Sequence, residues 1–376
     1  MVEIAVARIQ PRIYRYPVET PVRTSFGTMR DRPALLVEVT DADGAVGWGE
    51  VWCNFPTVGA EHRARLVHDT VAPLLLERRF SSPRDAWRHL TAALEVLAIQ
   101  SGEPGPLAQA IAGVDMALWD LAARRAGQPL CAFLGAAVPE TVPVYASGLN
   151  PDGPERLAAE KRAEGYRAFK LKVGFGADRD LANLAALRAV LGDDAGLMID
   201  ANQGWDLATA IDMSRQAAPF RLDWLEEPLR VDAPAEDWRR LADGAETPLS
   251  GGENLRGDTE FDDAIRGSVL QVIQPDIGKW GGFTGCLPVA RQALAAGKRF
   301  CPHWLGGGVG LLASLHLLAA AGGDGLLEVD SNPNPLRHLM AAPFPDIADG
   351  RMRVPRGAGL GVAPDLDALE RYRVWP

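Results

Sequence analysis

The chain has 376 residues, of which 47% are hydrophobic and 23% charged, and its net charge is −10. This composition is typical of a packed globular protein and excludes a disordered chain. The acidic balance, with no long basic run in the sequence, argues against a nucleic-acid partner. Because no apolar run approaches the roughly 18 residues of a membrane helix, we also expect no membrane partner.

The beginning of the sequence lacks the basic region and apolar core of a secretory signal. The four cysteines lie far apart and form no CxxC pair: Cys53, Cys131, Cys286 and Cys301. We therefore expect reduced thiols in a cytoplasmic protein.

Residues 1–50 have the pattern of an antiparallel β region. Leu35–Val39 is rich in aliphatic residues, and the turn signal Asp41–Gly44 joins it to Val46–Glu50 as a hairpin. The polar stretch 20–29 predicts a surface loop. From about residue 59 to residue 127 the pattern is helical, and we expect its apolar stripe to form core at Ile111, Val114, Leu118 and Leu121.

From Val142 onward, short apolar runs alternate with helical stretches. Eight such runs with helices between them imply parallel βαβ units that close into a barrel, so the fold class is α/β. The tail from about residue 332 is rich in proline and glycine, with a short helix expected at 365–373. The expected strands are Val144–Ser147, Ala168–Val173, Gly196–Asp200, Leu222–Glu226, Pro248–Gly252, Val269–Gln274, Arg299–His303 and Leu326–Val329.

Charged side chains stand at the carboxyl ends of seven of these runs. Consecutive members lie 23 to 28 residues apart, which is close to one βα unit per step. In a barrel they would converge on one mouth, where such folds place their active sites. The series is Lys172 (with Lys170), Asp200, Glu226, Glu253, Asp276, His303 and Glu328.

Three of these side chains, on consecutive strands, suggest a metal site. Bare carboxylates in one cavity would repel, and hard oxygen ligands suit Mg²⁺. A single histidine in the series argues against zinc. The metal would hold a substrate carboxylate and stabilise the enediolate that forms when the α-proton leaves. The expected ligands are Asp200, Glu226 and Glu253.

Two groups flank the metal triplet as candidate bases. Lys172 lies on one side, and the neighbouring Lys170 is expected to lower its pKa. His303 lies on the other side, where Asp276 would orient it and raise its basicity. Glu328 would donate a hydrogen bond to the enediolate if it is held protonated.

The motifs KLK, DANQ, WLEEP, GGEN, PDIGKWGGFTG, PHW and LLEVD, in this order and spacing, resemble the mandelate racemase subgroup of the enolase superfamily. The resemblance implies a modified (β/α)8 TIM-type barrel at 131–331. It also implies an α+β capping domain at 1–130, to which the segment 332–376 returns.

The same resemblance implies one Mg²⁺ per subunit on Asp200, Glu226 and Glu253, with Lys172 as a base and a His303–Asp276 dyad opposite. It further implies a small-molecule carboxylate substrate and a homo-oligomer, from dimer to octamer. In the muconate-lactonizing branch a lysine stands where this chain has Asp276, which favours the mandelate racemase subgroup. Lys279 has the wrong offset for that lysine, and we expect it to be structural or peripheral.

Substrate contacts are expected from lid loops and from positions beside the catalytic series. Asn202 shares a strand face with Asp200, although a turn-stabilising role is an alternative. Trp304 would point away from the barrel interior if its strand continued, and would still roof the pocket. The remaining candidates are Arg23, Thr24, Phe26, Trp52 and Asn54.

Two further features have plain structural explanations. Gly306–Gly310 lacks the Lys-Ser/Thr of a phosphate-binding loop, so we expect a barrel loop that needs close backbone approach. His316 lies in an apolar helical stretch and is expected to be a satisfied buried histidine.

The favoured activity is dehydration of an acid sugar, an aldonate or aldarate, to a 2-keto-3-deoxy acid, which makes the protein a lyase. The alternative is a racemase or epimerase that uses Lys172 and His303 on opposite faces of the enediolate. The two-lysine motif serves both reactions and does not decide between them. A catalytically silent binding protein is disfavoured, because no member of the series is missing.

Overall fold

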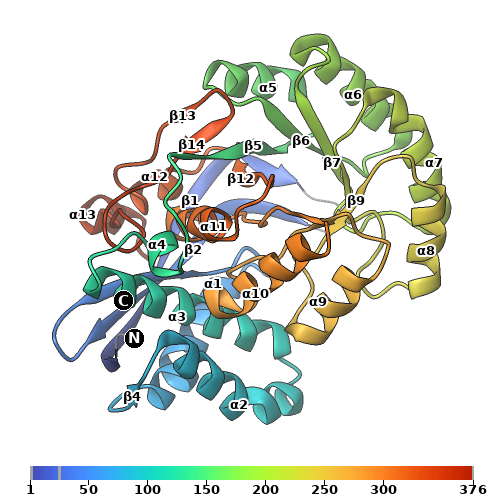
Figure 1. Ribbon diagram of the computed structural model, residues 1–376. Helices are drawn as coiled ribbons and strands as arrows, with labels where there is room; N and C mark the ends of the chain where they lie inside the picture. The colour runs from blue at the N-terminus through green and yellow to red at the C-terminus, as the bar shows by residue number, and fades with distance from the viewer. Residues whose placement is uncertain (1–2, 24–26, 375–376) are drawn as a thin grey trace.

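A computed structural model describes residues 3–23 and 27–374. The amino-terminal part forms an antiparallel sheet covered by helices, and the middle of the chain forms a ring of parallel strands surrounded by helices (Figure 1). No helix in the described part of the chain is long and apolar enough to cross a membrane.

The antiparallel sheet has the strand order β3-β2-β1-β4. The hairpin expected at Asp41–Gly44 is present, with Gly44 at a φ of 84° that suits glycine. The loop expected at 20–29 is shorter than predicted, because the first two strands stay paired as far as Arg23 and Thr28. The strands are β1 (Ile4–Arg23), β2 (Thr28–Asp41), β3 (Val46–Val51) and β4 (Arg79–Phe80).

One long helix, α3, packs directly on β3. Gly49 approaches so closely that an added Cβ would clash with the carbonyl of Gly113. The expected apolar stripe of α3 is buried, as predicted. Helices of this region are α1 (Gly59–Arg65), α2 (Pro83–Ser101), α3 (Pro104–Arg125) and α4 (Leu130–Phe133), with a π-helix at Leu66–Val71 and a 3-10 turn at Ala72–Leu74.

Eight parallel strands build the barrel, as the alternation of the sequence predicts. Strands β5 to β11 pair in chain order, and β12 pairs with β5. Every residue of β6 is buried, including two lysines. The strands are β5 (Thr141–Leu149), β6 (Ala168–Lys172), β7 (Gly196–Asp200), β8 (Leu225–Glu226), β9 (Leu249–Gly251), β10 (Val272–Ile273), β11 (Arg299–Phe300) and β12 (Leu327–Asp330).

Helices follow the barrel strands and cover them on the outside (Figure 1). Glycines end or begin several of them, as at Gly192 after α6 and Gly307 before α11. The helices are α5 (Pro154–Ala163), α6 (Ala177–Leu191), α7 (Leu207–Ala217), α8 (Ala235–Gly244), α9 (Gly257–Arg266), α10 (Gly282–Ala295) and α11 (Gly308–Ala321), with a 3-10 turn at Ala218–Phe220.

The tail returns to the antiparallel sheet. Its strand β14 pairs with β5, and the backbone N–H of Val374 donates to Ile13 in β1 at 2.9 Å. The end of the described chain therefore lies against β1 of the antiparallel sheet. The tail contains α12 (Pro335–Leu339), β13 (Ile347–Ala348), β14 (Arg351–Arg353), α13 (Leu366–Leu369) and a 3-10 turn at Glu370–Tyr372. The last two elements lie where a short helix was expected, at 365–373.

Candidate active site

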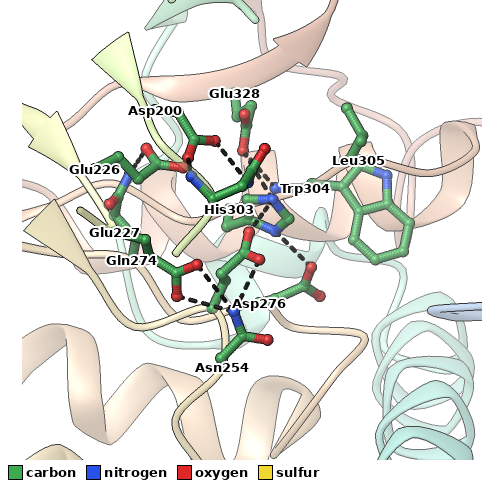
Figure 2. Close-up of polar contacts among 12 residues, drawn as sticks. Asp200, Glu226, Glu227, Asn254, Gln274, Asp276, His303, Trp304, Leu305 and Glu328 are labelled. Carbon is green, nitrogen blue, oxygen red and sulfur yellow. Dashed lines mark hydrogen bonds and ion pairs between the residues drawn. The ribbon is translucent and has the colours of Figure 1, made fainter. Parts of the chain in front are cut away.

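The structure brings the predicted charged series together at the carboxyl ends of the barrel strands (Figure 2). Lys172, Asp200 and Glu226 end their strands; Glu253, Asp276 and His303 follow theirs; and Lys170 and Glu328 lie within β6 and β12. All are buried, with at most 9% of any residue exposed. The cluster comprises Lys170, Lys172, Asp200, Glu226, Glu253, Asp276, His303 and Glu328.

The two lysines of β6 reach different carboxylates. The Lys172 Nζ lies 2.5 Å from Asp200, its neighbour in strand register. The Lys170 Nζ donates to Glu226 at 2.6 Å and lies 2.8 Å from Glu328. Burial lowers the pKa of Lys172, but Asp200 outweighs it and the pKa is raised. Lys170 does lower this pKa, as expected, but the adjacent carboxylate of Asp200 outweighs that effect, so the expected net lowering is not found.

His303 is held between two carboxylates. Its Nδ1 lies 2.7 Å from Asp276 Oδ2, and its Nε2 pairs with Glu253. Burial lowers the pKa of His303, but Glu253 and Glu328 together with the Asp276 hydrogen bond raise it well above the usual value. The Asp276 hydrogen bond contributes to this rise after the two glutamates, which is the direction predicted for the dyad, and the role of the dyad in proton transfer stays a prediction.

Glu328 accepts hydrogen bonds rather than donating them. Its Oε1 accepts from Ser147 Oγ at 2.5 Å, and its Oε2 accepts from the backbone N–H of Trp304 at 3.0 Å. Burial raises the pKa of Glu328, but the nearby cations Lys170 and His303 lower it overall. The condition for its expected role, a protonated carboxyl, is not met here because these cations stabilise the charged form.

The three expected metal ligands fit Mg²⁺ by chemistry. They supply hard carboxylate oxygens from three adjacent strand ends, and each is buried. Within residues 3–23 and 27–374, no three His, Cys, Asp or Glu side chains are arranged as a ready metal cage. The reason is that each ligand carboxylate is paired with a cation instead: Lys172 at Asp200, Lys170 at Glu226, and Lys279 and His303 at Glu253.

Lys279 lies in the cluster, so of its two expected roles, structural or peripheral, the peripheral one is wrong and the structural one stays a prediction. Its Nζ donates to Glu253 Oε1 at 2.9 Å and to Asn254 at 3.2 Å, and lies 4.7 Å from the ring centre of Trp52. Asn254 in turn donates to Glu227 at 2.9 Å. The sequence signal was present in the motifs GGEN and PDIGKWGG, but only the fold brings these loops together.

Two more polar side chains belong to the cluster, although the sequence patterns did not mark them as candidates. Gln274 donates to Glu226 Oε2 at 2.7 Å, from the end of β10 (Figure 2). Glu227, whose pKa burial raises to about 8, adopts a φ of 39° beside Glu226, an expected metal ligand. Such backbone strain gathers at functional sites.

The expected substrate contacts have mixed placements. Asn202 donates to Asp200 Oδ2 at 3.1 Å from a left-handed turn, so the turn-stabilising alternative holds and a substrate contact stays a prediction. Trp52 lies beside Lys279 at the mouth. Arg23 ends β1, and Thr24 and Phe26 lie outside the described residues.

Trp304 differs from the expected roof of the pocket. Its ring is 2% exposed and packs against the glycines at 278, 306 and 310. Only its backbone N–H reaches the cluster, while the ring points away from it (Figure 2). The chain has left β11 before Trp304, so strand alternation no longer sets the direction of this side chain.

The glycine-rich loop binds a carboxyl group that belongs to the chain itself. Glu50, at the end of GWGE, accepts from the backbone N–H groups of Gly307 at 2.5 Å and Gly310 at 2.9 Å. Burial raises the pKa of Glu50 to about 7. The expected close backbone approach is confirmed, because a Cβ at Gly307 would lie 2.5 Å from the Glu50 oxygen.

His316 is the satisfied buried histidine that was expected. It is fully buried, its Nδ1 lies 3.3 Å from the backbone N of Cys131, and its Nε2 lies 3.2 Å from the carbonyl of Leu360. These partners define one tautomer, with the proton on Nε2.

Family models match both parts of the chain. The model described as mandelate racemase/muconate lactonizing enzyme, N-terminal domain, matches residues 8–135, and the model described as enolase C-terminal domain-like matches residues 155–368. The chain belongs to the mandelate racemase/muconate lactonizing enzyme family of the enolase superfamily. The predicted superfamily and its barrel with a capping domain are thereby confirmed.

Solved members of this superfamily superimpose along the whole chain. A mandelate racemase/muconate lactonizing enzyme from Bordetella bronchiseptica is 56% identical, with a TM-score of 0.93 and coverage of 99% of this chain and 100% of that one. An enolase from Bradyrhizobium, complexed with magnesium and mandelic acid, is 30% identical, with a TM-score of 0.87 and full coverage of both chains.

Curated relatives catalyse more than one kind of reaction. D-galactarolactone cycloisomerase from Agrobacterium fabrum is 32% identical, covering 98% of this chain and 99% of its own length. L-talarate/galactarate dehydratase from Salmonella typhimurium is 36% identical over 73% of this chain and 67% of its own length. This chain is therefore an enzyme of a superfamily whose members include both lyases and isomerases.

Proposed function

We propose that this enzyme removes the α-proton of a hydroxy-carboxylate in a Mg²⁺-dependent reaction and dehydrates an acid sugar to a 2-keto-3-deoxy acid. The observation that carries the proposal is the placement of two proton-transfer groups on either side of one carboxylate cluster. Lys172 contacts Asp200 on β7, and His303 contacts Glu253 after β9. A substrate bound between them would present one face to each.

The metal would be held by Asp200, Glu226 and Glu253, and when bound it supplies positive charge for the substrate carboxylate and for the negative charge that develops after proton loss. A cation there would compete with Lys172 for Asp200, which leaves the amine able to accept a proton. Lys170, held at 2.6 Å from Glu226 and 2.8 Å from Glu328, stays an ammonium and adds positive charge.

In the dehydration of one C2 epimer His303 acts as a protonated imidazole, whereas for the opposite epimer the neutral ring would accept the α-proton. The proton on Nε2 is the one that a departing β-hydroxyl needs, since the Nδ1 proton is engaged by Asp276 at 2.7 Å. The β-C–O bond then breaks as the Cα–H electrons form the new double bond, and water leaves. The resulting enol tautomerises to the 2-keto-3-deoxy acid.

Racemisation or epimerisation is the second candidate, because the same two groups would remove a proton from one face and return one to the other. Loss of a ring oxygen in place of a hydroxyl would make the reaction a cycloisomerisation, which the similarity to D-galactarolactone cycloisomerase supports. All three begin with the same α-proton abstraction.

The test is ¹H NMR in D₂O with Mg²⁺-loaded enzyme and pooled aldonates, aldarates, their lactones and smaller α-hydroxy acids. We expect one acid to disappear as a deuterated 2-keto-3-deoxy product grows. Loss of an α-proton signal with accumulation of a stereoisomer would favour the racemase or epimerase. If no compound in the pool showed α-proton exchange or gave a product, the proposed substrate class would be contradicted.

A further inference from the structure

The loops that carry the His303–Asp276 dyad are fastened by the capping domain. Three alternate residues at and after the end of β3 make these contacts: Glu50, Trp52 and Asn54. Residues two apart in an extended segment share one side, so a single short stretch faces the barrel with all three. We call residues 50–54 the strap.

The strap contacts both loops of the dyad. Glu50 accepts from Gly307 and Gly310 in the loop after His303, and the Asn54 side-chain amide donates to the carbonyl of Leu305 in the same loop. The backbone N–H of Trp52 donates at 3.4 Å to the carbonyl of Gly278, in the loop after Asp276.

A short series of contacts continues from Glu50 to the imidazole. The carbonyl of Gly307 accepts from the indole N–H of Trp304 at 2.9 Å, and the ring of Trp304 packs under Gly310. Trp304 follows His303 directly, and its backbone N–H reaches Glu328 at 3.0 Å. A shift of the 304–310 loop therefore moves His303 relative to its partners.

The chemistry of the Glu50 contact makes it strong. Glu50 is 1% exposed, and its two oxygens each accept a backbone N–H at the beginning of a 14-residue helix, α11. A helix N-terminus carries partial positive charge, so a buried carboxylate there is held electrostatically as well as by hydrogen bonds. Glycine at positions 306 and 307 leaves room for this approach.

We propose that Glu50 is a positioning residue for the His303 side of the active site: by anchoring the 304–310 loop from the capping domain, it sets the imidazole against Asp276 and the reacting carbon. The kinetic part of this inference rests on the proposed function. The geometric part does not, and it is tested without a substrate.

The test uses two variants that break one contact from opposite sides. Glu50→Gln removes the charge, whereas Gly307→Ala keeps Glu50 and places a methyl group against its oxygen. The matched control is Glu38→Gln, which alters another buried carboxylate of the same sheet, one that pairs with Arg8 and Arg12 instead of the barrel.

The first readout is the downfield imidazole proton of His303 Nδ1 in ¹H NMR of the full-length protein, assigned by its loss in His303→Asn. We expect Glu50→Gln and Gly307→Ala to shift or broaden this resonance and Glu38→Gln to leave it in place. An unchanged resonance in folded Glu50→Gln or folded Gly307→Ala would overturn the positioning role, whatever the substrate proves to be.

The second readout is exchange of the α-proton in D₂O for the two C2 epimers of the acid that the wild-type enzyme turns over. In both Glu50→Gln and Gly307→Ala, exchange of the epimer whose α-proton His303 removes should fall by about tenfold or more. Exchange of the epimer whose α-proton Lys172 removes should stay within about twofold, because a small misplacement slows only the group that moves. Equal losses in both epimers would indicate a merely structural effect and overturn the proposal. Silence of the wild-type enzyme, with the NMR shift intact, would count against the proposed function alone.

Discussion

Lys172 lies inside strand β6, whereas His303 lies beyond the end of β11, in a segment that returns to regular structure only at α11. Lys172 is paired in parallel register with Asp200, so the sheet itself fixes its position. His303 instead forms an isolated β-bridge with Asp276, and the loop that follows it is hydrogen-bonded to Glu50 of the capping domain.

The difference shows that the two sides of the barrel mouth are held in position by different kinds of contact. One side depends on backbone pairing within the barrel, and the other depends on contacts between domains. Glu253 follows β9, which lies between the strands of the two sides in the sheet, and it pairs with His303 and Lys279 on the domain-held side. Substitutions on the sheet-held side, on the domain-held side and at Glu253 should therefore have different effects on the enzyme.

The largest effect is expected from Glu253→Gln. The variant removes one anionic metal ligand and the partner of His303 at once, so Mg²⁺ affinity should fall by about 100-fold or more and turnover should be abolished. Isothermal titration with Mg²⁺ measures the first effect without any substrate. The exposed Glu246→Gln is the control, and wild-type Mg²⁺ affinity in Glu253→Gln would refute the metal assignment.

An intermediate effect of opposite sign is expected from Lys279→Met. The Lys279 ammonium lies 2.9 Å from Glu253 and competes with a divalent cation for it. Its removal should tighten Mg²⁺ binding by about tenfold, since like charges within a few ångströms repel strongly in a buried site. The same titration measures this, with Lys161→Met in α5, a partly buried lysine that pairs with Glu164, as the control. Weaker Mg²⁺ binding would mean that Lys279 chiefly positions Glu253.

The smallest effect concerns the far part of α11, where His316 ties the helix to Cys131 and Leu360. Burial lowers the pKa of His316 to about 4, below the value of about 6.5 expected in the unfolded chain. The neutral ring therefore contributes stability above about pH 6.5 that is lost as the pH falls toward 4.

Between pH 7.5 and pH 5 the wild-type free energy of unfolding should fall by about 2 kcal/mol more than that of His316→Gln. Urea unfolding at the two pH values, at fixed Mg²⁺, measures the difference. The exposed His68→Gln should keep the wild-type pH dependence. An identical pH dependence in His316→Gln would show that this ring is not held neutral.

Much of the fold and of the cluster is predictable from the sequence, because both depend on local periodicity. The apolar runs mark the barrel strands, and parallel order then brings Lys172, Asp200 and Glu226 to one mouth without knowledge of any long-range contact. The strand ends are regular enough that even Glu253 and His303, which lie beyond their strands, arrive at the cluster.

What could not be predicted depends on contacts between distant segments. The contact between Lys279 and Glu253 could not be predicted, because the offset of Lys279 within its own loop says nothing about Glu253. Trp304 lies beyond β11, and its ring packs against Gly278 of a distant loop as well as against Gly306 and Gly310 of its own segment. The raised pKa of Lys172 depends on a carboxylate at 2.5 Å, which outweighs the effect of the neighbouring Lys170.

The most direct test of the central claim, that Lys172 and His303 act on opposite faces of one substrate, is stereospecific α-proton exchange. Mg²⁺-loaded Lys172→Ala and His303→Asn would be incubated in D₂O with each C2 epimer of the acid that the wild-type enzyme turns over. We predict that each variant keeps exchange for one epimer and loses it for the other by about 100-fold or more, in opposite senses. Loss of exchange for the same epimer in both variants would contradict the account.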